Sequence, residues 1–82
     1  MKTVQISLNS IGKVKSFVNT ISQFEYDFDL ISGRYVIDAK SIMGIFSLDL
    51  SKPIELVAHC KSDDQCQRFQ EKIEKFQVQE TM

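Results

Sequence analysis

The chain has 82 residues, 43% of them hydrophobic, and a formal net charge of −1. This length suits one small hydrophobic core, so we expect a single domain over residues 1–82. A net charge so near zero provides no field to hold a nucleic-acid backbone directly. Because the chain has neither a signal-type start nor eighteen consecutive apolar residues, we expect a cytoplasmic protein that does not contact a membrane.

The first part of the chain changes from a strand pattern to a helix pattern. Hydrophobic residues alternate over residues 3–8, which predicts a half-buried strand. From Ile11 to Phe24 they recur at steps of three and four, which predicts a helix over about residues 11–23. Ser10 precedes this helix and is its expected N-cap.

The middle of the chain predicts a hairpin and a short helix. Alternation over residues 24–30, a Ser-Gly-Arg turn and a second apolar run over residues 35–39 predict two paired strands. Residues 42–48 are mostly apolar and predict a short helix capped by Ser41, although Gly44 weakens it.

The C-terminal part predicts one more strand and one more helix. Residues 54–61 alternate, and the apolar positions from Cys66 to Phe76 follow helical spacing. Asp63 or Asp64 is the expected cap of this last helix. The order β-α-β-β-α-β-α predicts an α+β fold, in which helices cover one face of an antiparallel sheet.

The two cysteines do not indicate a redox or metal site. Cys60 and Cys66 form no CxxC pair, and in a reducing compartment we expect small buried hydrophobic side chains rather than a disulfide. With His59 they offer three ligands at no recognised zinc spacing. We therefore predict no metal and no cofactor.

Residues 39–48 carry a family resemblance. Their sequence, AKSIMGIFSL, resembles the AKSIMGIMSL signature of HPr, the histidine-containing phosphocarrier of the bacterial phosphoenolpyruvate:sugar phosphotransferase system. With Phe17, Val18 and Phe24 in the first helix, the resemblance extends over nearly the whole chain. It implies an open-faced β-sandwich, a four-stranded antiparallel sheet covered on one face by three helices.

The resemblance fails at the phosphate-carrying site. HPr proteins have NGLHARPA where the first helix begins, and Enzyme I phosphorylates its histidine. An ungapped alignment from Phe17 backwards sets Ser10 at the histidine. It sets Gly12 at the arginine and Lys13 at the proline. An imidazole is nucleophilic near pH 7 and passes its phosphate on, whereas a serine hydroxyl without a base does neither. We therefore predict a divergent HPr, similar to catabolite-repression HPr variants.

Two other phosphate acceptors remain as alternatives. Ser10 could accept a phosphate or bind an anion, helped by Lys13 and Lys15, but we favour a plain helix cap. His59 could make the chain a working phosphocarrier with a non-standard acceptor. We favour an ordinary strand histidine instead, because nothing near it in the sequence builds an anion site.

Ser41 has two interpretations. By resemblance it occupies the serine that an ATP-dependent HPr kinase phosphorylates in low-GC Gram-positive bacteria, where the product is a corepressor for a catabolite-control transcription factor. A phosphate at a helix start gains from the free N–H groups there. In the other interpretation, Ser41 only caps the helix and is kept by descent.

The short helix has more apolar residues than it can bury on one side, which predicts a docking surface rimmed by Lys40 and Lys52. The resemblance implies protein partners, namely phosphotransferase-system enzymes, HPr kinase or a catabolite-control regulator. We predict a binding protein rather than an enzyme, without catalytic residues, as a monomer or weak dimer; a fold kept for an unrelated interaction is a further alternative. The docking candidates are Lys15, Ile42, Met43 and Phe46.

Overall fold

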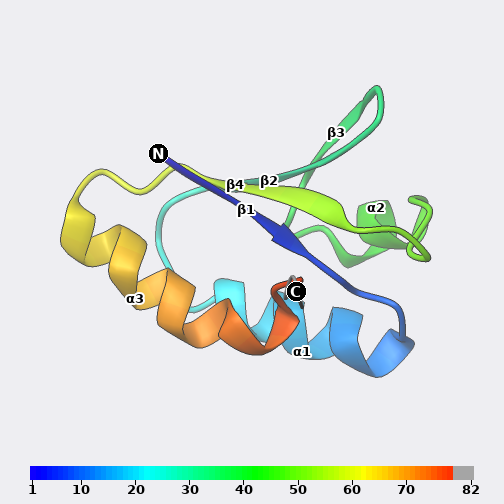
Figure 1. Ribbon diagram of the computed structural model, residues 1–82, viewed down its shortest axis with the longest axis horizontal. Helices are drawn as coiled ribbons and strands as arrows, with labels where there is room; N and C mark the ends of the chain where they lie inside the picture. The colour runs from blue at the N-terminus through cyan, green and yellow to red at the C-terminus, as the bar shows by residue number, and fades with distance from the viewer. Residues whose placement is uncertain (79–82) are drawn as a thin grey trace, which may run out of the picture.

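The structure, a computed structural model, describes residues 1–78. One layer is a four-stranded antiparallel sheet in the order β1-β4-β2-β3, and helices lie against one of its faces (Figure 1). This arrangement confirms the predicted α+β fold and element order. The strands are β1 (Lys2–Ile6), β2 (Phe28–Ser32), β3 (Tyr35–Asp38) and β4 (Ile54–Ala58). The helices are α1 (Ile11–Ile21), α2 (Ile42–Phe46), α3 (Asp63–Ile73) and the 3₁₀ turn η1 (Glu74–Phe76).

Alternate strand residues form the sheet side of the core. Leu56 in β4 is paired with Val4 of β1 and with Leu30 of β2, so these three side chains form one row across the sheet. All three are buried. Because the side-chain period of a strand is two, Glu55 and Val57 point to the opposite face, where they are half-exposed.

Aromatic contacts join the helices to the sheet. The rings of Phe28 in β2 and Phe69 in α3 stack with centroids 5.6 Å apart. Phe17 of α1 meets Phe76 of η1 edge to face at 5.6 Å. Since α1 and α3 also contact each other under the sheet (Figure 1), the two long helices and the sheet share one core.

The second strand starts later than predicted. It begins at Phe28, and residues 24–27 form a loop. The physical reason is an interaction outside the local pattern: Lys40 Nζ donates hydrogen bonds to the carbonyl oxygens of Phe24 (2.7 Å) and Tyr26 (3.1 Å). Those carbonyls are therefore satisfied by an ammonium group rather than by a neighbouring strand.

The predicted cap of α3, Asp63 or Asp64, is wrong by one or two residues. Ser62 is the N-cap, and its Oγ accepts a hydrogen bond from the backbone N–H of Gln65 at 3.2 Å. Asp63 and Asp64 lie in the first turn instead. Their negative charges are favourable there because the free N–H groups make a helix start electropositive.

The expectation for the cysteines is also wrong. A disulfide joins Cys60, just after β4, to Cys66 in α3, with Cα atoms 5.4 Å apart. This separation lies in the usual range for bridged cysteines. The six-residue spacing did not reveal it, because the two residues meet only where the chain turns back from the sheet into the helix.

Gly44 has a low helix propensity, but the position has little room for a side chain. A Cβ atom at this position would lie 3.3 Å from Ser41 Oγ and 3.4 Å from Ile37 Cδ1. The missing side chain thus leaves room for the Ser41 hydroxyl that caps the five-residue helix α2. Within residues 1–78, none of the helices is long and apolar enough to cross a bilayer.

Candidate functional site

Ser10 caps α1, as predicted. Its backbone is extended, and its Oγ accepts a hydrogen bond from the backbone N–H of Lys13 at 3.1 Å. The side chain is exposed, and within residues 1–78 no histidine or carboxylate hydrogen-bonds to it. The hydroxyl therefore has a structural partner but no base to activate it as a nucleophile.

The positions that follow Ser10 do not rebuild an anion site. Gly12 is exposed and provides no side chain where the family signature has arginine. No atom lies within 4 Å of a Cβ built at Gly12, so a larger residue would fit there. Lys13 and Lys15 are exposed on α1, while Ile11, which the helical spacing placed in the apolar stripe, is 64% exposed.

Replacing Ser10 by alanine is expected to lower the free energy of unfolding by about 1 kcal/mol, because an N–H group of the first turn of α1 loses its acceptor. Urea unfolding measures the change. Ser22→Ala, an exposed position at the other end of α1, is the control and should change stability by less than about 0.5 kcal/mol. An equal loss in both variants would contradict the capping role.

Ser41 caps α2, again as predicted. Its Oγ accepts a hydrogen bond from the Gly44 N–H at 3.3 Å, and its carbonyl accepts one from the Ile45 N–H at 3.0 Å. The side chain is exposed, so the hydroxyl can be reached from solvent.

The apolar residues of α2 divide into two groups. Ile45 is buried and Ile42 packs partly against the core. Met43 and Phe46 are 76% and 39% exposed, so both of these docking candidates on α2 face solvent, as Lys15 does on α1. Helices α1 and α2 contact each other, so their exposed apolar residues lie on two adjacent helices.

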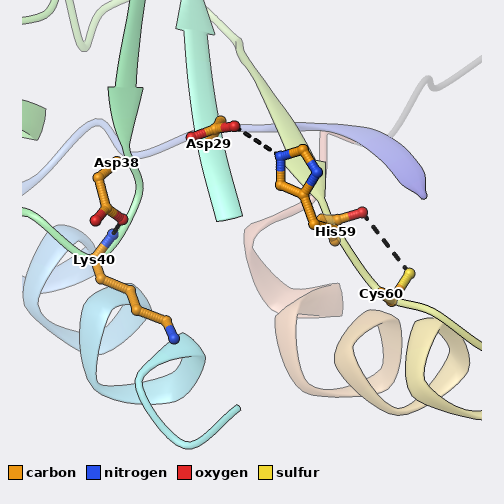
Figure 2. A network of polar contacts seen from close by, with 6 residues as sticks. Asp29, Asp38, Lys40, His59 and Cys60 are labelled. Carbon is orange, nitrogen blue, oxygen red and sulfur yellow. Dashed lines mark hydrogen bonds and ion pairs between the residues drawn. The ribbon is translucent and has the colours of Figure 1, made fainter. Parts of the chain in front are cut away.

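We expected Lys40 to border this surface, but its ammonium group lies elsewhere. Its long stem reaches back to the loop over residues 24–27, where the ammonium group is bound by two carbonyls and lies 5.7 Å from the centroid of the Phe28 ring. Figure 2 shows the side chain extending away from Asp38. Lys52 is exposed and lines a groove of about 550 Å³ between the β2–β3 turn and the segment before β4.

His59 lies just after β4 and pairs with a carboxylate. Its Nε2 is 2.7 Å from Asp29 Oδ2 (Figure 2), with the two side chains 42% and 37% exposed. Asp27, Asp29 and Asp38 line the same shallow hollow as the imidazole. These carboxylates repel a phosphate donor, so the surroundings of His59 are poor for phosphoryl transfer.

The three ligands considered for zinc do not converge. The His59 ring faces Asp29 (Figure 2), whereas the Cys60 sulfur is bonded to Cys66 in α3. In the described part of the chain, no three His, Cys, Asp or Glu side chains are placed to hold a metal ion. Sequence spacing could not reveal the pairing of His59 with Asp29, because it depends on β2 lying beside β4.

The comparisons with known proteins agree with this architecture. The family model of the HPr component phosphorylation site of the phosphotransferase system matches residues 13–77, starting three residues after Ser10. The crystal structure of HPr-C-His from Thermoanaerobacter tengcongensis is 26% identical over 89% of this chain and 90% of that chain, with a TM-score of 0.70.

A second structure shows the same fold. The phosphocarrier protein HPr from Bacillus anthracis str. Ames is 24% identical, over 87% of this chain and 92% of that chain, with a TM-score of 0.63. No curated protein matched. Since the family model spans most of the sequence, the chain belongs to the HPr family of the phosphotransferase system.

Proposed function

We propose that this HPr-family protein acts by binding protein partners and does not carry phosphohistidine. The observation that carries the proposal is the start of α1, where Ser10 serves as a cap and neither an imidazole nor an arginine stands beside it. Without these groups, the phosphate can be neither accepted nor steadied as the family chemistry requires.

Ser41 is the regulatory phosphorylation site in this proposal. Its support is the AKSIMGI segment, which resembles the family signature, together with the exposure of the hydroxyl. A phosphate adds nearly two negative charges beside α2, next to the exposed side chain of Met43. Phosphorylation therefore changes the charge of the surface that we propose for docking, formed by Lys15, Ile42, Met43 and Phe46.

The proposed partners are an HPr kinase, phosphotransferase-system enzymes and a catabolite-control regulator. We place the protein in the cytoplasm, as a single domain over residues 1–82 and as a monomer or weak dimer.

Incubation with ATP and an HPr kinase is expected to add one phosphate, because the hydroxyl of Ser41 is exposed in a segment that resembles the family's kinase site. Intact-mass measurement and peptide mapping locate it. Ser41→Ala should abolish the modification, while Ser47→Ala, an exposed serine at the other end of α2, should leave it unchanged. Unmodified wild-type protein, under conditions where a reference HPr is modified, would contradict the assignment of Ser41.

A further inference from the structure

The Cys60–Cys66 bridge ties the sheet to α3. Cys60 lies two residues after the end of β4, and Cys66 is the fourth residue of α3. Both line a surface hollow of about 400 Å³, together with Lys2 and Lys61. The bridge therefore lies beside this surface hollow, whose charged side chains are those of Lys2, Lys61 and Asp63.

The two cysteines differ in exposure. Cys60 is only 4% exposed, whereas Cys66 on the helix is half-buried. We therefore expect a thiolate that approaches from solvent to attack the sulfur of Cys66. Thiol–disulfide exchange requires such an approach to one sulfur, while the other sulfur leaves with the electron pair.

The fold also accommodates the reduced state. Cys60 Sγ lies 3.8 Å from the carbonyl oxygen of Ala58 (Figure 2). A disulfide sulfur has no hydrogen to donate, but a thiol has, so this contact becomes a weak hydrogen bond only after reduction. The buried sulfur thus has a partner in each redox state.

Other contacts hold the start of α3 without the bridge. Gln65 accepts hydrogen bonds from the Tyr26 hydroxyl at its carbonyl oxygen (2.9 Å) and from the Lys61 N–H at its Oε1 (2.8 Å). Burial raises the pKa of the Tyr26 hydroxyl, although Arg68 opposes the shift, so the hydroxyl keeps its donor proton in neutral solution. These contacts do not involve the bridge, so we expect its opening to loosen this region rather than unfold the protein.

We propose that Cys60 and Cys66 form a thiol–disulfide exchange site, which a dithiol opens and a low-molecular-weight disulfide closes. A thiolate of the dithiol attacks Cys66 Sγ, the Cys60–Cys66 bond breaks, and Cys60 leaves as a thiolate that takes a proton. The second thiol of the dithiol then displaces Cys66, which is also protonated. The protein gains two electrons and two protons, and the dithiol becomes a cyclic disulfide.

The bridge closes again by the reverse type of exchange, in which the two cysteines are oxidised and a small disulfide is reduced. One cysteine thiolate attacks the small disulfide and forms a mixed disulfide, and the second cysteine displaces the small thiol. Two small thiols are released for each bridge formed. This site is independent of Ser41, so its success or failure leaves the proposed phosphorylation untouched.

The experiment equilibrates the native protein in buffers with different ratios of reduced to oxidised dithiothreitol, then traps free thiols with an alkylating reagent. Intact mass is expected to show two populations, with no alkyl group or with two, that exchange as the ratio changes. Two alkyl groups at every ratio, or a bridge that opens only in denaturant, would overturn the proposal.

Hydrogen exchange gives a second readout on the same samples. Reduction is expected to speed amide exchange in α3 between residues 66 and 69 on the order of tenfold, while α1 is unchanged, because only α3 loses its tether. The double variant Cys60→Ser, Cys66→Ser is the control and should exchange equally in both buffers. Equal amide exchange in oxidised and reduced wild-type protein would contradict the expectation that the bridge stabilises the start of α3.

Single variants test the point of attack. In Cys60→Ser the remaining Cys66 should alkylate rapidly, whereas in Cys66→Ser the remaining Cys60 should alkylate roughly tenfold more slowly, because it is buried. Circular dichroism checks that both variants are folded. Equal alkylation rates in folded variants would overturn the assignment of Cys66 as the accessible sulfur.

Discussion

Replacing Phe69 by alanine is expected to lower the free energy of unfolding by about 4 kcal/mol. The side chain is fully buried and stacks on Phe28, so its removal leaves a cavity between α3 and the sheet. Domains of this size have a total stability of roughly 5–10 kcal/mol, so the variant should keep about 1–6 kcal/mol and lose a large part of its stability. Urea unfolding, monitored by circular dichroism with the disulfide kept oxidised, measures the difference.

Phe46→Ala is the matched control for this prediction. The Phe46 side chain is 39% exposed on α2, so the same deletion should cost about 1 kcal/mol or less. If Phe69→Ala does not fold, Phe69→Leu provides a milder measurement, with an expected loss of about 1–2 kcal/mol. A loss at Phe69 no larger than the loss at Phe46 would contradict the packing of α3 on β2.

The elements that local pattern controls could be predicted from the sequence. The alternating pattern of β4 and the helical spacing of α1 arise because each element buries one face. The caps Ser10 and Ser41 could be predicted because the free N–H groups at a helix start need acceptors. These features depend on residues within one turn or a few positions. The antiparallel sheet followed from the order of such elements and from the family resemblance.

The features that depend on distant residues could not be predicted. The loop before β2 depends on Lys40 reaching the Phe24 carbonyl, sixteen residues away in sequence. The pairing of His59 with Asp29 spans thirty residues, and it arises because β2 and β4 are neighbours. Neither contact leaves a local periodic signal, so only the tertiary arrangement reveals them.

The candidate site shows the same division. The structure decides how much of the predicted docking surface is available: Met43 faces solvent, but Lys40, expected at the edge of the surface, is bound to the loop over residues 24–27. The sequence pattern shows that α2 has an excess of apolar side chains, but it does not show which of them are buried in the core. Ile45 is the residue that the core buries completely.

Incubation with Enzyme I and phosphoenolpyruvate is expected to leave the protein without acid-labile phosphate, whereas a reference HPr becomes fully modified. Ser10 has no base to activate its hydroxyl, and the imidazole of His59 lies among carboxylates rather than at a helix start. Intact-mass measurement before and after acid treatment distinguishes a phosphohistidine from a phosphoserine, because only the first is lost in acid.

Variants that rebuild the site make this expectation sharper. Ser10→His introduces the imidazole, and Gly12→Arg adds the cation at a position with no atom within 4 Å of its Cβ. The double variant is expected to accept acid-labile phosphate, and Ser10→His alone should accept less, because the phosphate oxygens lack the guanidinium that steadies them. His59→Ala in the wild-type background should change nothing. Phosphate on the wild-type protein that disappears in His59→Ala would instead establish His59 as the acceptor and overturn the proposal that this chain acts by binding alone.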